Sequence, residues 1–148
     1  MAQQAQSARQ PRKLGYFAVI LYNLTGGRLY HGRTTDPAGV LVLTTTGRKS
    51  GQQRSVSLIY IRDGASYVVT ASNAGKDTHP GWYFNLRSHP EAQIRLKDQT
   101  IPVVAEEANP EQRQRLWEQL VQTAPMYARY AKTTSREIPM MLLRPADA

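Results

Sequence analysis

Short apolar or alternating segments follow one another along this chain from residue 40 onward, as expected for a protein built mainly from strands. In residues 54–62, Val56, Leu58 and Tyr60 form one alternating set, which is typical of a strand with two different faces. The Asp-Gly pair at residues 63–64 is a strong hairpin signal. The pattern predicts strands over residues 40–46, 54–62, 67–71, 92–96, 100–105 and 140–144.

Two helices are predicted between these strands. One is short, over residues 82–88, and the other begins after Asn109, where Pro110 suits the first helical position and Gln112 completes a capping-box pattern. The chain has no strand–helix–strand alternation and no GxGxxG motif, which argues against a doubly wound nucleotide-binding sheet. The expected fold is therefore mainly β with α: a small antiparallel barrel of about six strands with helices packed outside.

The most apolar run is LGYFAVILYNL, residues 14–24, which predicts a helix that ends at Gly26 and Gly27. It is well short of the ~20 residues that a membrane-spanning helix needs. No small-residue cleavage site follows it, as one would in a signal peptide. Two interpretations stay open: a helix packed on the domain, or a segment that contacts a membrane surface, since Arg12 and Lys13 precede it.

The length and composition are those of one globular domain. A chain of 148 residues with a hydrophobic fraction of 41% is long enough to bury a core. Residues 1–12, rich in Gln, Ala, Ser and Arg, are predicted to be a disordered basic tail, and residues 13–148 a single domain with the N-terminal helix. The absence of Cys excludes disulfides, thiolate metal sites and Cys nucleophiles.

The positive charge is concentrated in the N-terminal third. Residues 1–56 carry eight Lys or Arg against one acid, a balance of +7, whereas the whole chain has a net charge of +8. A polyanionic ligand, an anionic membrane surface and nucleic acid would each be attracted by such a concentration of positive charge.

The stretch LTTTGRKSGQQRSV, residues 43–56, places much of this charge on one tight turn. Gly47 and Gly51 are expected to allow positive φ and to expose backbone N–H groups. With Arg48 and Lys49 as cations and Ser50 as a hydroxyl donor, such a turn would bind an anion. It is not a P-loop, because GxxxxGK[ST] is absent. An ordinary exposed hairpin loop is the alternative.

Two further segments carry candidate chemistry. ASNAGKDTHPGWYFNL, residues 71–86, runs from a strand into a short helix, so donors and a helix N-terminus meet there, and Trp82 could stack on a planar ring or anchor the core. Farther on, Tyr127 and Tyr130 lie three residues apart, on one face of a helix if the segment is helical. They could line an apolar pocket and donate protons, or serve as half-buried packing residues.

Several other classes of site are not indicated. The three His have no metal-ligand spacing and are expected to be ordinary solvated residues. No GxSxG or HExxH motif is present, and the acids form no obvious catalytic pair. With few acid–base candidates but a marked anion-binding loop, the chain suggests a bound cofactor that carries the chemistry.

The segments LTTTGRKSGQQR and ASNAGKDTHPGWYFNL, with a Tyr-containing segment that ends in REIPMMLL, resemble the deazaflavin-dependent nitroreductase family. That family lies within the split β-barrel flavin and deazaflavin oxidoreductases, and the resemblance covers residues 14–145. It implies a split β-barrel that binds coenzyme F420, a deazaflavin with a phosphodiester and an oligoglutamate tail. It also implies hydride transfer from the reduced cofactor to a quinone or nitroaromatic acceptor.

The resemblance also assigns roles to residues at matching motif positions. Those for cofactor binding are Arg48, Lys49, Ser50, Arg54, Ser72, Asn73, Ala74, Gly75, Lys76, Pro80, Gly81 and Trp82. Those for the acceptor and catalysis are Tyr130, Tyr127 and Ser72, and no metal is implied. Some members carry Lys where this chain has Asn73, so this chain lacks one positive charge that could contact the cofactor. Lys76 is a candidate substitute for that charge.

Alternatives remain at this point. An FMN-binding split-barrel protein and a non-catalytic deazaflavin binder share the expected fold, and a basic nucleic-acid-binding module would use the charge but lacks a recognised motif. The expected partner is a small-molecule acceptor and not nucleic acid, with peripheral membrane contact through the N-terminal helix as an open alternative. The protein is expected to be cytoplasmic, membrane-associated on the cytoplasmic face if that helix binds lipid, and either a monomer or a homodimer.

Overall fold

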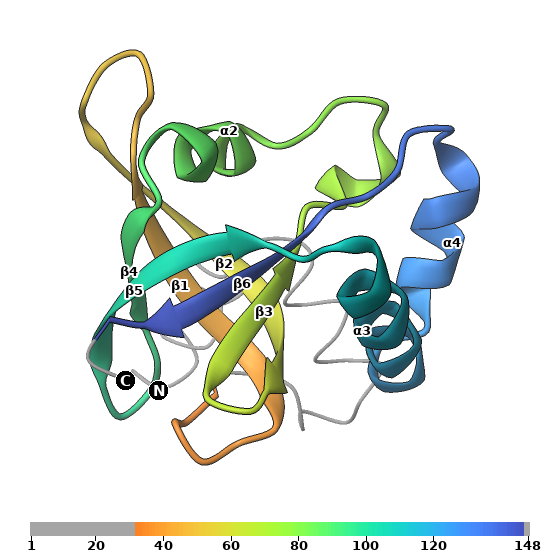
Figure 1. Ribbon diagram of the computed structural model, residues 1–148, viewed down its shortest axis with the longest axis horizontal. Helices are drawn as coiled ribbons and strands as arrows, with labels where there is room; N and C mark the ends of the chain where they lie inside the picture. Colours follow the sequence, from red (N-terminus) through yellow and green to blue (C-terminus); the bar gives the residue numbers. More distant parts are fainter. Residues whose placement is uncertain (1–31, 147–148) are drawn as a thin grey trace, which may run out of the picture.

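The computed structural model describes residues 32–146 of the chain (Figure 1). The predicted basic tail, residues 1–12, and the predicted N-terminal helix, residues 14–24, lie outside the described residues. No helix in the described part is both long and apolar enough to cross a membrane.

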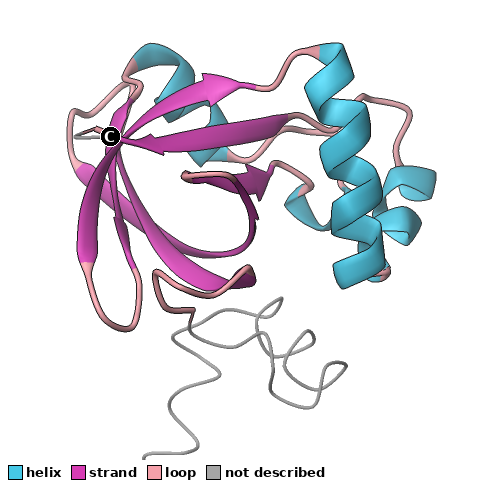
Figure 2. Cartoon of the chain, turned by 60° about the horizontal axis from the view of Figure 1, so that its bottom comes forward, coloured by secondary structure: helices cyan, strands magenta, loops and turns pink. Residues whose placement is uncertain are grey.

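Six antiparallel strands close into a barrel in the order β1-β2-β3-β6-β5-β4, which confirms the predicted fold class. The strands are β1 (Ala38–Thr46), β2 (Gln53–Asp63), β3 (Ser66–Thr70), β4 (Glu91–Arg95), β5 (Thr100–Glu107) and β6 (Met140–Pro145). The helices are the 3₁₀ turn η1 (Asn73–Gly75), α2 (Gly81–Ser88), α3 (Pro110–Thr123) and α4 (Met126–Thr133). The predicted Tyr-containing segment is therefore helical, since it forms α4. Most of the helical chain lies to one side of the barrel (Figure 2).

The barrel closes through pairings that are distant in sequence. β1 and β2 pair along the whole of β1, but β1 meets β4 over only three residue pairs, from Val42↔Arg95 to Thr44↔Gln93. The last strand, β6, lies between β3 and β5 and pairs with both (Figure 1). The C-terminal strand is thus part of the barrel wall.

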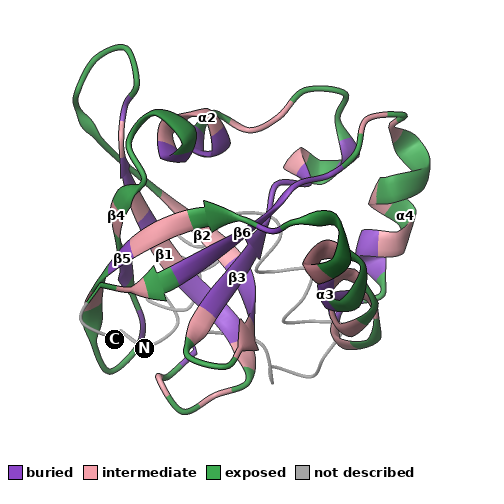
Figure 3. Ribbon diagram, viewed as in Figure 1, coloured by how far each residue is buried: buried purple, intermediate pink, exposed green. Residues whose placement is uncertain are grey.

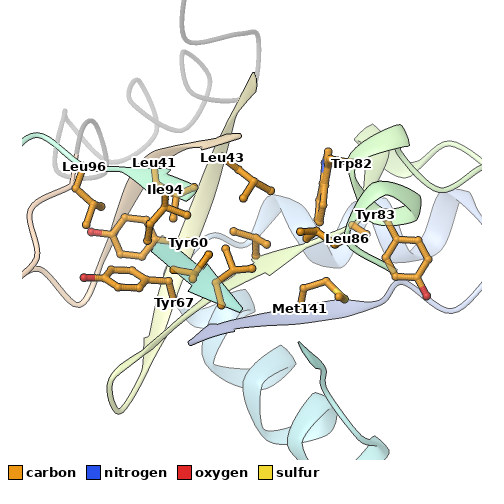
Figure 4. Packing of buried hydrophobic residues seen from close by; sticks show 14 residues of the cluster. Leu41, Leu43, Tyr60, Tyr67, Trp82, Tyr83, Leu86, Ile94, Leu96 and Met141 are labelled. Atoms are coloured by element: carbon orange, nitrogen blue, oxygen red, sulfur yellow. The ribbon is translucent and has the colours of Figure 1, made fainter. Parts of the chain in front are cut away.

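Side chains alternate between two cores because successive residues of a strand face opposite sides. Leu41, Leu43 and Tyr60 point into the barrel interior, where Trp82 and Leu86 reach in from α2 (Figure 4). The opposite face forms a second core with α3 and α4, and Figure 3 shows that α3 buries only its inward side. β1, β2 and β3 are therefore covered on both faces near the helices.

The capping box at the start of α3 is formed as predicted. The Asn109 side chain accepts a 2.9 Å hydrogen bond from the Gln112 N–H, and the Gln112 side chain accepts one from the Asn109 N–H. Asn109→Ala is expected to lower the free energy of unfolding by about 1 kcal/mol, because backbone donors at the helix start lose a partner. Denaturant unfolding measures the change. Gln114→Ala, at an exposed site within α3, is the control, and an equal loss in both variants would contradict the role of the cap.

Candidate active site

The loop between β1 and β2 closes on itself. The Gly47 N–H donates to the Gln52 carbonyl at 2.7 Å, and the Gly51 N–H donates to the Gly47 carbonyl at 2.8 Å. The Ser50 hydroxyl accepts from the Gln52 N–H at 3.1 Å. Only Gly51 of the two glycines has a positive φ, 72°. The expectation that both glycines present free N–H groups to an anion is therefore wrong, because both are engaged within the loop.

Of the cations in and beside this loop, Arg48 is docked on α2, whereas Lys49 and, at the start of β2, Arg54 are exposed. The Arg48 guanidinium lies 4.5 Å from the centre of the Phe84 ring, and the backbone N–H of Arg48 donates to the Asn85 side-chain oxygen at 3.1 Å. These contacts attach the loop to α2. Lys49 and Arg54 are exposed, and no hydrogen bond or ion pair within residues 32–146 involves their charged groups. The loop and the start of β2 thus present two exposed cationic side chains.

The loop after β3 begins with an unusual backbone turn. Asn73, Ala74 and Gly75 have consecutive positive φ angles of 47°, 59° and 78°. The Asn73 side chain donates to the Thr78 carbonyl at 3.0 Å, and Thr133 of α4 donates its hydroxyl proton to the Gly75 carbonyl at 2.9 Å. The turn is therefore held both from within the loop and by α4.

A cavity of about 140 Å³ opens between β2, this loop, α2 and α4. Its walls are Val56, Ser57, Leu58, Ile59, Thr70, Ser72, Asn73, Pro80, Trp82 and Tyr127. Five residues of the sequence-based assignment thus meet at one place, although they come from two separate segments, residues 71–86 and the Tyr-containing segment. Ser72 is buried, and Trp82 both faces the cavity and packs in the barrel core. The two interpretations of Trp82 are therefore compatible.

The other assigned residues lie outside the lining of this cavity, as far as the described residues define it. They are Arg48, Lys49, Ser50 and Arg54 near the β1–β2 loop, Ala74, Gly75, Lys76 and Gly81 on the 71–86 segment, and Tyr130. Helix α2 links the two groups, because Trp82 lines the cavity while Phe84 and Asn85 hold Arg48. The cavity and the β1–β2 loop therefore contact the same short helix.

The two tyrosines of α4 differ in their surroundings. Tyr127 is buried and lines the cavity, and its ring centre lies 5.5 Å from that of Tyr130. Burial raises the pKa of Tyr127 well above the ordinary value, and the neighbouring Tyr130 adds to the rise. Tyr130 is half-buried, and its hydroxyl lies 3.9 Å from the Met126 sulfur. Tyr127 therefore stays a neutral phenol that can donate a hydrogen bond into the cavity.

Three features of the site were missed by the sequence reasoning. The apolar wall formed by Val56, Leu58 and Ile59 belongs to β2, whose alternation predicted two faces but not which part of a face would stay open. Arg136 holds the loop after β3 through several hydrogen bonds, which no motif indicated. The expectation that His79 is an ordinary solvated residue is wrong, because its ring is half-buried against Tyr83 and bonded to Arg136.

The described residues contain no group of His, Asp and Glu that could hold a metal ion. The chemistry available is that of hydroxyl donors, an indole ring, an apolar strand surface and exposed cations. Such a set can hold an organic, anionic cofactor and orient an apolar acceptor.

Comparison with known proteins shows which family this chain belongs to. The chain is 37% identical over 126 residues to an F420H(2)-dependent quinone reductase of Mycobacterium tuberculosis, covering 83% of this chain and 84% of that protein. A solved F420-H2 dependent reductase, FDR-A, matches with 35% identity and a TM-score of 0.66, covering 71% of this chain and 93% of that one. A chain described as a domain-swapped dimer matches with 30% identity and a TM-score of 0.67, covering 95% and 96%. Residues 17–145 match the family model described as F420H(2)-dependent quinone reductase, and the chain belongs to that family.

Proposed function

We propose that this protein transfers a hydride from reduced coenzyme F420 to a quinone. The observation that carries the proposal is the cavity beside Trp82, which combines an apolar strand wall with the buried Ser72 and Tyr127 hydroxyls. A quinone is flat and apolar with two carbonyl oxygens, so it needs such a mixed lining. Family membership and the relatives' names support the same reaction.

The chain's residues suit an anionic cofactor. We assign the phosphate and the glutamate tail to Arg48, Lys49, Ser50 and Arg54, because Lys49 and Arg54 are exposed cations next to a loop already docked on α2. We assign the ring to the segment that holds Ser72, Asn73, Ala74, Gly75, Lys76, Pro80, Gly81 and Trp82. When bound, the reduced cofactor supplies the hydride.

The protein's own contribution is orientation and charge stabilisation. Trp82 and the β2 wall give the cavity an apolar lining, and hydrogen bonds are stronger in such low-dielectric surroundings. The Tyr127 phenol and the Ser72 hydroxyl can donate to the acceptor oxygen as it gains negative charge. Tyr130 packs edge to face on Tyr127 and fixes the orientation of its ring. No covalent intermediate with the protein is needed.

A titration of the purified protein with F420, followed by intrinsic fluorescence, tests the cofactor assignment. FMN is the parallel control, and reduced F420 with a soluble quinone then tests turnover. We expect saturable binding of F420 in preference to FMN, and oxidation of reduced F420 that depends on the quinone. Binding of FMN alone would favour an FMN-binding split barrel, and F420 binding without turnover would favour a non-catalytic deazaflavin binder.

The remaining assignments stay predictions. A nitroaromatic acceptor would have to occupy the same cavity, and membrane contact and a cytoplasmic location rest on the N-terminal sequence and composition. A homodimer is suggested by one related chain that is described as a domain-swapped dimer. Size-exclusion chromatography with light scattering distinguishes monomer from dimer.

A further inference from the structure

Arg136, in the segment between α4 and β6, binds the loop after β3 at three places. Its Nε donates to the Lys76 carbonyl at 2.9 Å, and its Nη2 donates to the Ala71 and Ser72 carbonyls at 3.1 and 2.9 Å. Its Nη1 lies 2.9 Å from Nδ1 of His79. A single guanidinium therefore contacts the beginning, the middle and the end of the loop.

The contact with His79 requires one protonation state. A guanidinium has donors only, so Nδ1 of His79 must carry a lone pair and accept. The ring is then neutral, with its proton on Nε2. Protonation of Nδ1 would place two donors against each other and break the bond to Arg136. The ring also packs on α2, since its centre lies 4.7 Å from that of Tyr83 and 5.7 Å from that of Phe84.

The charged groups around His79 favour the same state. Burial lowers the pKa of His79, and the positive charges of Arg136 and of Arg87 on α2 lower it further. Glu107, at the end of β5, opposes them and raises the pKa, but it already accepts a 2.6 Å hydrogen bond from the Tyr83 hydroxyl. The net effect is a lowered pKa, in agreement with the geometry.

Both ends of the loop that Arg136 contacts line the cavity. Ser72, whose carbonyl accepts from Arg136, and Pro80, which follows His79, are wall residues of that cavity. We propose that Arg136 and His79 are positioning residues, a clamp that holds the 71–80 loop against the cavity, and that the His79 end of this clamp is held only while His79 is neutral. The proposal rests on the proposed function, because it names residues that shape the same site.

The sign of the pH effect follows from the lowered pKa. The folded state favours neutral His79, so its contribution to stability is fully present above the unfolded pKa of about 6.5. That contribution is lost as the pH falls through the lower folded pKa. Loosening of the loop in that window should raise KM for the acceptor before the protein unfolds.

Three variants test the clamp. His79→Asn keeps an acceptor near the position of Nδ1 but cannot titrate, Arg136→Lys keeps the charge but loses the fork of donors, and His89→Asn alters an exposed histidine as the control. The full-length variants are compared by circular dichroism, by F420 affinity and by kcat/KM for a quinone between about pH 5 and 8. Nitrogen-15 NMR of the histidine rings reports the tautomer without any need for activity.

The expected results differ for each variant. His79 in the wild-type protein should show the Nε2–H tautomer, and kcat/KM should fall at acid pH through a rise in KM. His79→Asn should remove this acid limb, His89→Asn should keep it, and Arg136→Lys should lower kcat/KM about tenfold at neutral pH with circular dichroism unchanged. An Nδ1–H tautomer, an acid limb that persists in His79→Asn, or full activity in Arg136→Lys would overturn the proposal.

Failure of the proposed function would look different. A folded wild-type protein without quinone turnover at any pH would reject the proposed reaction. The histidine tautomer and the pH dependence of F420 binding would still test the clamp in that case. If Arg136→Lys does not fold, the pH profile of His79→Asn decides alone.

Discussion

Replacing Lys49 and Arg54 together with alanine is expected to weaken F420 binding about a hundredfold, while kcat at saturating cofactor stays close to that of the wild type. Each lost charged hydrogen bond to a phosphate or carboxylate is worth roughly 1.5 kcal/mol, and each 1.4 kcal/mol is tenfold in affinity. Both cations lie outside the lining of the cavity, so the chemistry should be little affected. Arg48 is left in place, because its contacts with Phe84 and Asn85 hold the loop on α2.

The matched control is Arg95→Ala with Lys97→Ala. These exposed cations belong to β4 and the hairpin after it, and their loss changes the net charge by the same amount. Salt should weaken the wild-type affinity more than that of the Lys49 and Arg54 variant, because fewer charge pairs remain to be screened. Fluorescence titration measures both effects. Equal loss of affinity in the two double variants would mean that only the overall field matters and that the β1–β2 loop is not the anion site.

Gly75→Ala is expected to lower the free energy of unfolding by roughly 3 kcal/mol and to abolish most quinone reduction. Gly75 has a φ of 78°, and a Cβ there would collide with Thr133 Oγ1 and lie 3.2 Å from Tyr130 Cα. The hydroxyl of Thr133 would then lose its bond to the Gly75 carbonyl. Because α4 also carries Tyr127, displacement of this helix should distort the cavity as well.

Gly64→Ala is the control that distinguishes backbone strain from a steric collision of the new Cβ. Gly64 has a φ of 58° in the β2–β3 hairpin, but a Cβ there meets no atom within 4 Å. That variant should lose only about 1 kcal/mol, the cost of a left-handed alanine, and should keep its activity. Denaturant unfolding and steady-state kinetics of both variants supply the comparison. If the two variants lose the same stability and activity, the close approach of α4 to the turn is not important.

These two predictions concern different parts of the candidate site, the β1–β2 loop and the turn at Gly75. The cations at the β1–β2 loop lie on one side of α2, and the turn at Gly75 joins the loop that lines the cavity to α4 on the other side. Affinity for the cofactor tail and the shape of the cavity can therefore change separately.

Much of the barrel could be predicted because its signals are local. Hairpins such as the one at Asp63-Gly64 join neighbours in sequence, and alternation such as that of Val56, Leu58 and Tyr60 follows from the geometry of a single strand. All six predicted strands are present, with ends that differ by a few residues. The closing contact of β4 with the middle of β1 has no such local signal, because it depends on how the whole sheet twists.

The site was predictable to a smaller extent. Residues in recognisable segments, such as Ser72, Trp82 and Tyr127, were assigned through the resemblance, and the tertiary structure brings them to one cavity. The β1–β2 loop was expected to bind an anion through free backbone N–H groups, but Gly47 and Gly51 use theirs within the loop. Whether a backbone donor is free depends on the closed shape of its turn, and the residue types alone do not determine that shape.

By itself, the sequence determined the succession of strands and helices, the excess of positive charge in the N-terminal third and the capping box of α3, since each depends on neighbours along the chain. Only the tertiary structure decided that Arg136 reaches back about 60 residues to clamp the loop that ends at His79, and that β2 supplies the apolar wall of the cavity. Contacts between distant segments form only when the barrel closes and the helices pack on it. The sequence pattern of one segment therefore does not indicate which distant segments it will contact.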